Sequence, residues 1–302
     1  MTTLFKSIRL GNLTLKSPIV CASGTAGFLK ELKGLVDFGP LGAGITKTVT
    51  LEPRSGNRGV RIAEVDCGIL NAIGLENPGI DAFLKEVYPR IKKLPVRVIV
   101  SVAAKSPDEF SVVAKKLAKE PSIRAVELNL SCPNVKGKII AQHPQEAAMA
   151  IKALRRSFSG TVIAKLSPDV TDIASVAVQA QDAGADALSL VNTFVGIAFD
   201  VTTQKPLLGN VTGGYSGKGI KPIALCKVWK AAQVVSIPII GGGGICDWKD
   251  AAEFFIAGAT AVSVGTATFV SPKSIQEIYH GLYRHMRKHK IKKMGKLEIR
   301  VP

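Results

Sequence analysis

The sequence is poor in aromatic and acidic residues, and it has no long apolar run. Aromatic side chains make up 6% of its 302 residues. No stretch approaches the roughly 18 consecutive apolar residues that a transmembrane helix needs. Residues 1–15 (MTTLFKSIRLGNLTL) contain neither the apolar core nor the cleavage site of a signal peptide. We therefore expect a cytoplasmic protein without a membrane segment.

The five cysteines form no recognisable metal or redox motif. Cys21, Cys67, Cys132, Cys226 and Cys246 include no CxxC pair, which argues against a structural zinc site, a dithiol motif or an iron–sulfur cluster held by this chain. Cys21, Cys226 and Cys246 occur in apolar or helix-start contexts and are expected to be packing residues. We expect no role for Cys67. The four histidines are not grouped as metal ligands, so we expect no metal.

Acidic residues are too few to balance the basic ones. The 40 Lys and Arg residues against 23 Asp and Glu residues give a net charge of +17. Such a charge favours nucleic acid, an acidic partner or an anionic ligand. The densest basic run, residues 284–296, has no interleaved aromatic residues that could stack on bases, and it is typical of a solvated helix end. We therefore expect no nucleic-acid binding.

Eight short apolar runs alternate with helix-length amphipathic segments. The runs are rich in Val and Ile without strict polar alternation, as expected of strands buried on both faces of a parallel sheet. Eight such units predict an α/β fold, a (β/α)8 TIM barrel that forms one domain over residues 1–302. An open doubly wound sheet is the alternative, but the GxGxxG fingerprint is missing after the first strand. The predicted strands are 18–22, 43–48, 96–103, 125–131, 161–167, 187–193, 237–243 and 261–267.

Capping signals indicate where several helices begin. Asn77-Pro78 and Ser106-Pro107 each combine a capping side chain with proline at the first helical position. Asp247 is expected to cap a later helix. The predicted helices extend from Asn77-Pro78 through 90 and from Ser106-Pro107 through about 119, with others near 144–158, 171–183, 222–235 and 247–258.

Two additions to the barrel are predicted. Residues 7–15 (SIRLGNLTL) are typical of a hairpin with a Gly-Asn turn, which would cover the barrel floor. Residues 194–221 form a long insertion after the sixth strand. An insertion of this length in a compact domain is usually functional.

Polar residues gather at the predicted C-terminal ends of the strands, where function is located in such barrels. Lys47 and Lys165 would be costly there unless they pair with neighbouring groups, extend to water or bind an anionic ligand. The glycine run 241–244 follows the seventh strand, and Gly265-Thr266 follows the eighth. Consecutive glycines let backbone amides approach a phosphate, so these two segments predict a phosphate site.

Residues 127–134 (ELNLSCPN) place a cysteine among short polar residues just after a strand. Pro133 prevents regular structure from continuing. A thiol in such a loop could act as a general base if nearby dipoles or cations lowered its pKa. The flanking asparagines supply donors and acceptors that suit a planar, amide-bearing substrate.

These segments together resemble the dihydroorotate dehydrogenases, FMN enzymes of pyrimidine biosynthesis, over essentially the whole chain. The NAIGLENPG form, and a cysteine where the membrane-associated class has serine, resemble the soluble class I enzymes, and within them the NAD-linked class IB branch. The matching stretches are 22–27, 46–48, 71–79, 129–134, 164–168, 191–193, 210–225, 239–245 and 265–267.

The resemblance implies a role for each matching residue. Cys132 would remove a proton from C5 of (S)-dihydroorotate while a hydride leaves C6 for the flavin N5, which yields orotate, and Lys47 would contact both flavin and substrate. Substrate would be bound by Lys47, Asn71, Ala72, Ile73, Gly74, Leu75, Asn129, Asn134, Asn192 and Thr193. FMN would be bound by Ser23, Lys47, Thr48, Ser101, Asn129, Lys165, Val191, Gly217, Gly243, Gly244, Gly265 and Thr266.

The sequence departs from the family pattern in two places. Family members usually carry asparagine where this chain has Ser101. Residues 137–144 (GKIIAQHP) are shorter than the usual loop and lack its glycine pair and aromatic residue. The NAD-linked branch also works with a second polypeptide that carries FAD and an iron–sulfur cluster. The resemblance therefore implies such a partner, and a homodimer or heterotetramer.

Three other functions share parts of this pattern. A tRNA dihydrouridine synthase also combines an FMN barrel with a cysteine, but it carries an additional C-terminal helical domain, and only about 36 residues follow Thr266 here. A dihydropyrimidine dehydrogenase-like domain, acting on uracil-type substrates, is normally part of a longer chain. A non-enzymatic partner-binding barrel would not need the flavin-site residue types that this chain retains everywhere except at position 101.

Cys132→Ala is expected to leave FMN bound and to slow reduction of the flavin by dihydroorotate by ~100- to 10,000-fold, the usual contribution of a general acid–base group. Cys132→Ser should fall between, because a hydroxyl is a poorer base near neutral pH. Anaerobic stopped-flow absorbance measures both rates. A wild-type rate in the alanine variant would remove Cys132 as the base.

Overall fold

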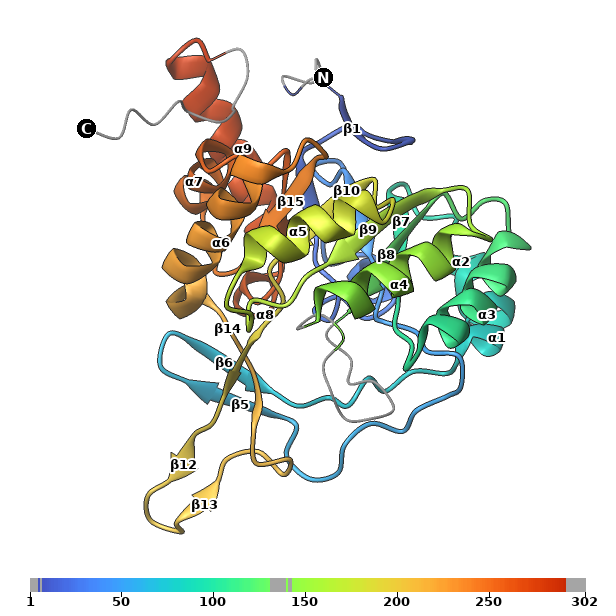
Figure 1. Ribbon diagram of the computed structural model, residues 1–302. Helices are drawn as coiled ribbons and strands as arrows, with labels where there is room; N and C mark the ends of the chain where they lie inside the picture. Colours follow the sequence, from blue (N-terminus) through green and yellow to red (C-terminus); the bar gives the residue numbers. More distant parts are fainter. Residues whose placement is uncertain (1–4, 6, 131–139, 141–142, 292–302) are drawn as a thin grey trace.

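The computed structural model describes residues 5, 7–130, 140 and 143–291. Eight parallel strands close into a barrel, in chain order, and β16 pairs with β3 to complete the ring (Figure 1). Each strand falls inside one of the predicted runs, so the predicted barrel is confirmed. The strands are β3 (Ile19–Cys21), β4 (Ala43–Ile45), β7 (Arg97–Val102), β8 (Ala125–Asn129), β9 (Thr161–Lys165), β10 (Ala187–Leu190), β15 (Ile239–Gly242) and β16 (Ala261–Val264).

Helices surround the barrel (Figure 1). The Ser106 side chain accepts a hydrogen bond from the Glu109 amide at the start of α3, and Asp247 forms a capping box with Asp250 at the start of α7, as predicted. The helices are α1 (Ile80–Ala82), α2 (Tyr88–Ile91), α3 (Pro107–Ala118), α4 (Pro144–Arg155), α5 (Ile173–Asp182), α6 (Lys221–Val234), α7 (Trp248–Ile256), α8 (Ala267–Val270) and α9 (Ser274–Lys288).

The first predicted helix begins later than expected, and the reason lies in the side chain of Asn77. Helix α1 starts at Ile80 after Gly79, which has a φ of 81°. The Asn77 Oδ1 accepts hydrogen bonds from the amides of Gly79 (2.8 Å) and Thr50 (3.1 Å). Asn77 therefore holds a turn against a neighbouring loop and does not cap the helix, so the predicted cap was wrong.

The lower part of the barrel interior is apolar and is built in levels. Because successive side chains of a strand face opposite sides, alternate strands contribute to each level. One level consists of alanines from β4, β8, β10 and β16, and the next consists of Val or Ile from β3, β7, β9 and β15. These residues, Ala43, Ala125, Ala187 and Ala261 with Val20, Ile99, Ile163 and Ile240, belong to one buried cluster.

The N-terminal hairpin closes this end of the barrel, as predicted. Strands β1 (Ile8–Leu10) and β2 (Leu13–Leu15) pair through a Gly-Asn turn. Leu10, Leu13 and Leu15 join the same apolar cluster beneath the alanine level, where the small side chains leave room for them. The Thr161 hydroxyl ties the hairpin down, because it donates to the Leu10 carbonyl (3.0 Å) and accepts from the Asn12 amide (3.1 Å).

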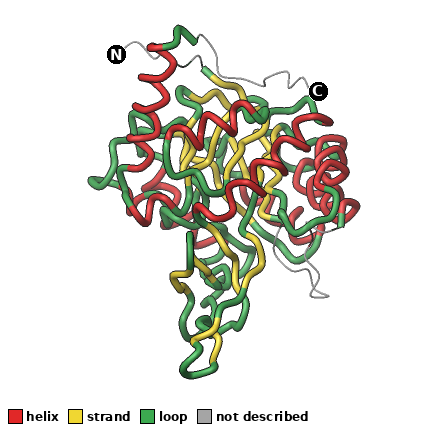
Figure 2. The backbone as a smooth tube through the Cα atoms, turned by 90° about the vertical axis from the view of Figure 1, so that its left-hand side faces the viewer, coloured by secondary structure: helices red, strands yellow, loops and turns green. Residues whose placement is uncertain are grey.

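A four-stranded antiparallel sheet projects from the opposite end (Figures 1 and 2). Its strand order is β11-β14-β6-β5. Strands β11 (Phe194–Gly196) and β14 (Gly213–Ser216) belong to the predicted insertion, as do β12 (Phe199–Asp200) and β13 (Lys205–Pro206) of the hairpin at the tip. Strands β5 (Ile62–Val65) and β6 (Gly68–Asn71) come from the segment after β4, where no strands were predicted.

Leu10→Ala is expected to lower the free energy of unfolding by about 2–5 kcal/mol, because Leu10 is fully buried in the barrel floor. Thr14→Ala, an exposed position of the same hairpin, should change it by less than about 0.5 kcal/mol. Urea denaturation followed by circular dichroism compares the two. Equal effects would show that the hairpin does not pack into the barrel.

Candidate active site

A cavity of about 730 Å³ lies at the C-terminal ends of the barrel strands, between the barrel and the projecting sheet. This volume is within the usual range for a small-molecule or cofactor site. The structure brings together most of the predicted site residues, which come from motifs far apart in sequence. The predicted residues that line the cavity are Ser23, Lys47, Thr48, Asn71, Ile73, Gly74, Leu75, Asn129, Lys165, Val191, Asn192, Thr193, Gly217, Gly243, Gly244, Gly265 and Thr266.

Two of the predicted residues that the structure describes are not part of this lining, and two others are not described. Ser101 is fully buried, one step below the cavity, and Ala72 is buried with its carbonyl accepting a hydrogen bond from the Asn57 side chain. The fully buried Ser101 side chain therefore has no surface that a ligand in the cavity could contact, while the backbone contact predicted for Ala72 stays a prediction. Cys132 and Asn134 lie outside the described residues.

The interior of the barrel becomes polar just below the cavity. Ser101, Glu127 and Lys165 each lie two residues beyond a member of the apolar Val/Ile or alanine level in the same strand, so they continue the inward-facing sets. Ser101 and Glu127 are fully buried, whereas the Lys165 side chain is 12% exposed and reaches the cavity. A carboxyl group thus lies inside the barrel beneath the site.

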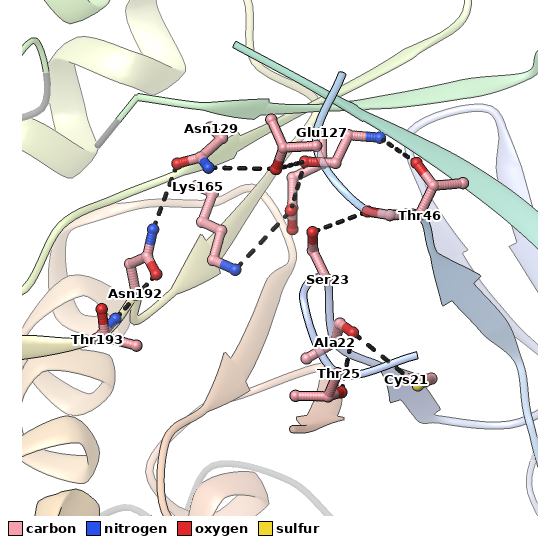
Figure 3. Close-up of polar contacts among 12 residues, drawn as sticks. Cys21, Ala22, Ser23, Thr25, Thr46, Glu127, Asn129, Lys165, Asn192 and Thr193 are labelled. Atoms are coloured by element: carbon pink, nitrogen blue, oxygen red, sulfur yellow. Dashed lines mark hydrogen bonds and ion pairs between the residues drawn. The ribbon is translucent and has the colours of Figure 1, made fainter. Parts of the chain in front are cut away.

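A continuous chain of hydrogen bonds links the cavity wall to this carboxylate (Figure 3). The Asn192 amide donates to the Asn129 carbonyl oxygen (3.3 Å), and the Asn129 amide donates to the Thr48 hydroxyl (3.3 Å). The hydroxyls of Thr48 and Ser101 are 2.9 Å apart, and Ser101 Oγ donates to Glu127 Oε1 over a long 3.5 Å.

The direction of this chain follows from the number of hydrogens available. Ser101 has one hydroxyl hydrogen, so an arrangement in which Ser101 donates to Glu127 requires Thr48 to donate to Ser101. Every link then donates toward Glu127, and such aligned bonds polarise one another. The same oxygen, Glu127 Oε1, also lies 3.9 Å from Lys165 Nζ.

Each of the two lysines at the strand ends has a carboxylate partner. Lys47 Nζ lies 3.5 Å from Glu76 Oε2, which also accepts from Arg61 Nη1 at 2.9 Å. The hydrogen bond from Arg61 and the charge of Lys47 lower the pKa of Glu76. Lys165 is paired with Glu127. Pairing with neighbouring groups was one of the readings that the sequence left open.

Sequence reasoning did not single out Glu76, Arg61 or Glu127. Glu76 lies inside the NAIGLENPG motif, but nothing in the motif shows that it meets Lys47. Glu127 carried a usable signal, because it is a lone carboxylate in the otherwise apolar run 125–128. A buried charge of this kind is costly unless it is paired, so a partner could have been sought.

The glycines around the cavity are required for two different reasons. Gly217, Gly243 and Gly244 have φ values of 116°, 121° and 82°, and a Cβ at each would lie within 3.0 Å of a neighbouring atom, so the fold alone demands glycine. A Cβ at Gly265 would meet nothing closer than Ala22 Cβ at 3.5 Å. Nothing in the surrounding protein therefore requires glycine at 265, although this residue lines the cavity.

Of the three cysteines expected to be packing residues, one fits this expectation and two do not. Cys21 is buried in the barrel wall, and burial raises the pKa of its thiol to about 12, as suits a packing residue. Cys226 and Cys246 are exposed, so the prediction that they are packing residues was wrong. Within the described part of the chain, no three His, Cys, Asp or Glu side chains are grouped so that they could hold a metal ion.

The fold and cavity define a class: a (β/α)8 barrel with cationic side chains and glycine turns around a ligand site. A sequence profile of the dihydroorotate dehydrogenase family matches residues 6–286. The chain belongs to the dihydroorotate dehydrogenase family, a family of oxidoreductases of pyrimidine biosynthesis.

Named relatives cover nearly the whole chain. The catalytic subunit of dihydroorotate dehydrogenase B (NAD(+)) from Bacteroides thetaiotaomicron is 42% identical, over 97% of this chain and 99% of its own. The protein of the same name from Carboxydothermus hydrogenoformans is 46% identical, over 96% and 95%. A crystal structure of DHODH in complex with ferulenol from Eimeria tenella has a TM-score of 0.80 at 22% identity, covering 98% of this chain and 89% of that one. This last likeness supports the fold.

Among the described residues, no helix is long and apolar enough to cross a bilayer.

Proposed function

We propose that the chain is the catalytic subunit of a cytoplasmic, NAD-linked dihydroorotate dehydrogenase, and that it binds FMN in the cavity and oxidises (S)-dihydroorotate to orotate. One observation carries this proposal. Residues predicted for flavin and substrate, which come from at least six separate motifs, line one cavity of about 730 Å³. Family membership supports the activity, and the cavity supports the assignment of residues.

The glycine at 265 supports a phosphate-bearing cofactor. The protein around it leaves space for a Cβ, so the backbone here is open to close approach by a ligand such as a phosphate. Thr266, the next residue, donates through its hydroxyl to Ser216 (2.9 Å), which joins the barrel to the projecting sheet beside this position. Gly265 and Thr266, with Gly217, Gly243 and Gly244, would hold the phosphate of FMN.

The remaining polar groups of the cavity would hold the flavin ring and the substrate. FMN, when bound, would accept the hydride that leaves C6 of the substrate. Ser23, Thr48, Lys165 and Val191 would contact the cofactor. Asn71, Asn129, Asn192 and Thr193, from three separate strand ends, would hydrogen-bond the pyrimidine. Lys47 would offset the charge of the substrate carboxylate.

Cys132 would take the proton from C5 of the substrate. It follows β8 by three residues and lies between Asn129, which lines the cavity, and Asn134. Its role is proposed from the NLSCPN motif, because this residue lies outside the described part of the chain.

We infer that electrons leave through a second polypeptide carrying FAD and an iron–sulfur cluster. The names of the relatives describe them as catalytic subunits and specify NAD(+). This chain has neither a CxxC pair nor a GxGxxG fingerprint. Its net charge of +17 would favour an acidic surface on such a partner, in an assembly built on a homodimer.

The visible spectrum of the purified chain under anaerobic conditions tests this function. At near-neutral pH we expect the absorption bands of oxidised flavin, and adding L-dihydroorotate should bleach these bands. Bands that persist with dihydroorotate but bleach with dihydrouracil would favour a dihydropyrimidine dehydrogenase-like activity. Bleaching by neither compound would contradict the proposal.

Gly265→Ala is expected to weaken FMN binding at least ~10-fold, because the added methyl group enters the space that the phosphate would occupy. The flavin-free protein should unfold at an unchanged or slightly higher temperature, because alanine fits the backbone and restricts the unfolded chain. Fluorescence titration with FMN and differential scanning calorimetry measure the two effects. Gly244→Ala serves as the contrast, since it should destabilise the fold itself. Unchanged FMN affinity in Gly265→Ala would remove this segment from the phosphate site.

A further inference from the structure

Glu127 occupies an unusual place for a carboxylate. It is fully buried in the barrel interior, above the apolar levels and below the cavity floor. Burying an ionised carboxylate costs several kcal/mol unless it is paired and hydrogen-bonded. The fold alone gives no reason to place one there, since neighbouring inward-facing positions are Ile45, Ser189 and Ser263.

Glu127 has few contacts, and they involve only one of its two carboxylate oxygens. Its Oε1 faces both the Ser101 hydroxyl at 3.5 Å and Lys165 Nζ at 3.9 Å. Its Oε2 has no hydrogen-bond partner among the described residues. This carboxylate is therefore only partly compensated. Lys165 is 12% exposed at the cavity floor, so the lysine is the member of the pair that a ligand can reach.

We propose that Glu127 is a positioning residue that holds Lys165 beneath the flavin and offsets part of its positive charge. The inference rests on the proposed binding of FMN. Lys165 alone would favour the reduced, anionic cofactor over the neutral oxidised one. A negative charge fixed behind the lysine opposes this preference. Glu127 thus keeps the flavin able to pass its electrons on, because an overstabilised reduced cofactor would retain them.

The hydrogen-bond chain gives Glu127 a second effect. In the arrangement in which Ser101 donates to Glu127, Thr48 and the asparagine pair also donate toward this carboxylate. This fixes the Asn129 carbonyl oxygen toward Asn192 and orients both amides at the cavity wall. The same buried charge therefore sets the position of the lysine and the direction of the donors that the substrate would meet.

The potential of the bound flavin tests the proposal on the FMN-loaded chain. Glu127→Gln, which has the same shape without the charge, should raise the ratio of the dissociation constants of oxidised to reduced FMN about tenfold, equivalent to ~30 mV for a two-electron couple. Lys165→Met should lower the ratio. The double variant, Glu127→Gln with Lys165→Met, should return close to wild type. Glu127→Asp, which keeps the charge, is the conservative control and should change the ratio less than about threefold. Titration against reference dyes measures each potential.

A second measurement uses the flavin-free protein and does not depend on the proposed function. Lys165→Met leaves the buried carboxylate without its cation and should lower the Tm by roughly 5 °C or more, and adding Glu127→Gln should restore it. If the wild-type chain bound no FMN, the proposed function would fail while this cycle still reported on the ion pair. If Lys165→Met lowered the Tm and the double variant restored it, but Glu127→Gln left the flavin potential unchanged, the ion pair would have only a structural role. This result would overturn the proposal. Absence of restoration in the double variant would show that the two charges are not coupled.

Discussion

The pairing of β16 with β3, which closes the barrel, is the constraint from which the rest of the structure follows. Closure forces every inward side chain into a shared interior, in which alternate strands supply each level. The height of a residue along its strand then decides its environment. Alanine, Val and Ile occupy the lower levels, a carboxylate and serines the next, and lysine and asparagine the rim. Residues that stabilise the barrel therefore lie toward its floor, and residues that line the cavity lie at the C-terminal ends of its strands.

This separation explains the arrangement of charge in the site. A lysine at the rim of an apolar interior needs a counter-ion. Glu127, below the cavity, pairs with Lys165, and Glu76, in the loop after β6, pairs with Lys47. The two partners differ in cost. Glu76 is exposed to water and is shared with Arg61, whereas Glu127 is fully desolvated. Only the second can act through a low dielectric, where the field of a single charge is weakly screened.

The sequence predicted the barrel well because its strands are separate Val- and Ile-rich runs, and it predicted caps where the side chain was free to turn back on its own helix. It failed at Asn77 because a distant amide, that of Thr50, competes for the same oxygen. It missed β5 and β6 because they form no apolar run: Ile62–Val65 (IAEV) contains a glutamate and has no buried residue. Most residues that line the cavity were predictable by motif, but the pairings Lys47–Glu76 and Lys165–Glu127 join segments that are distant in the sequence.

The projecting sheet joins two insertions that are separate in sequence. Strand β6 comes from the segment after β4 and β14 from the segment after β10, yet they pair along their length, and the Asn71 side chain donates to the Gly214 carbonyl at 3.1 Å. Because the two insertions are hydrogen-bonded to each other, the projecting sheet that covers the cavity is expected to move as one unit. Transplanting one of these insertions between related enzymes would leave an unmatched strand edge, and the two segments have to be inherited as a pair.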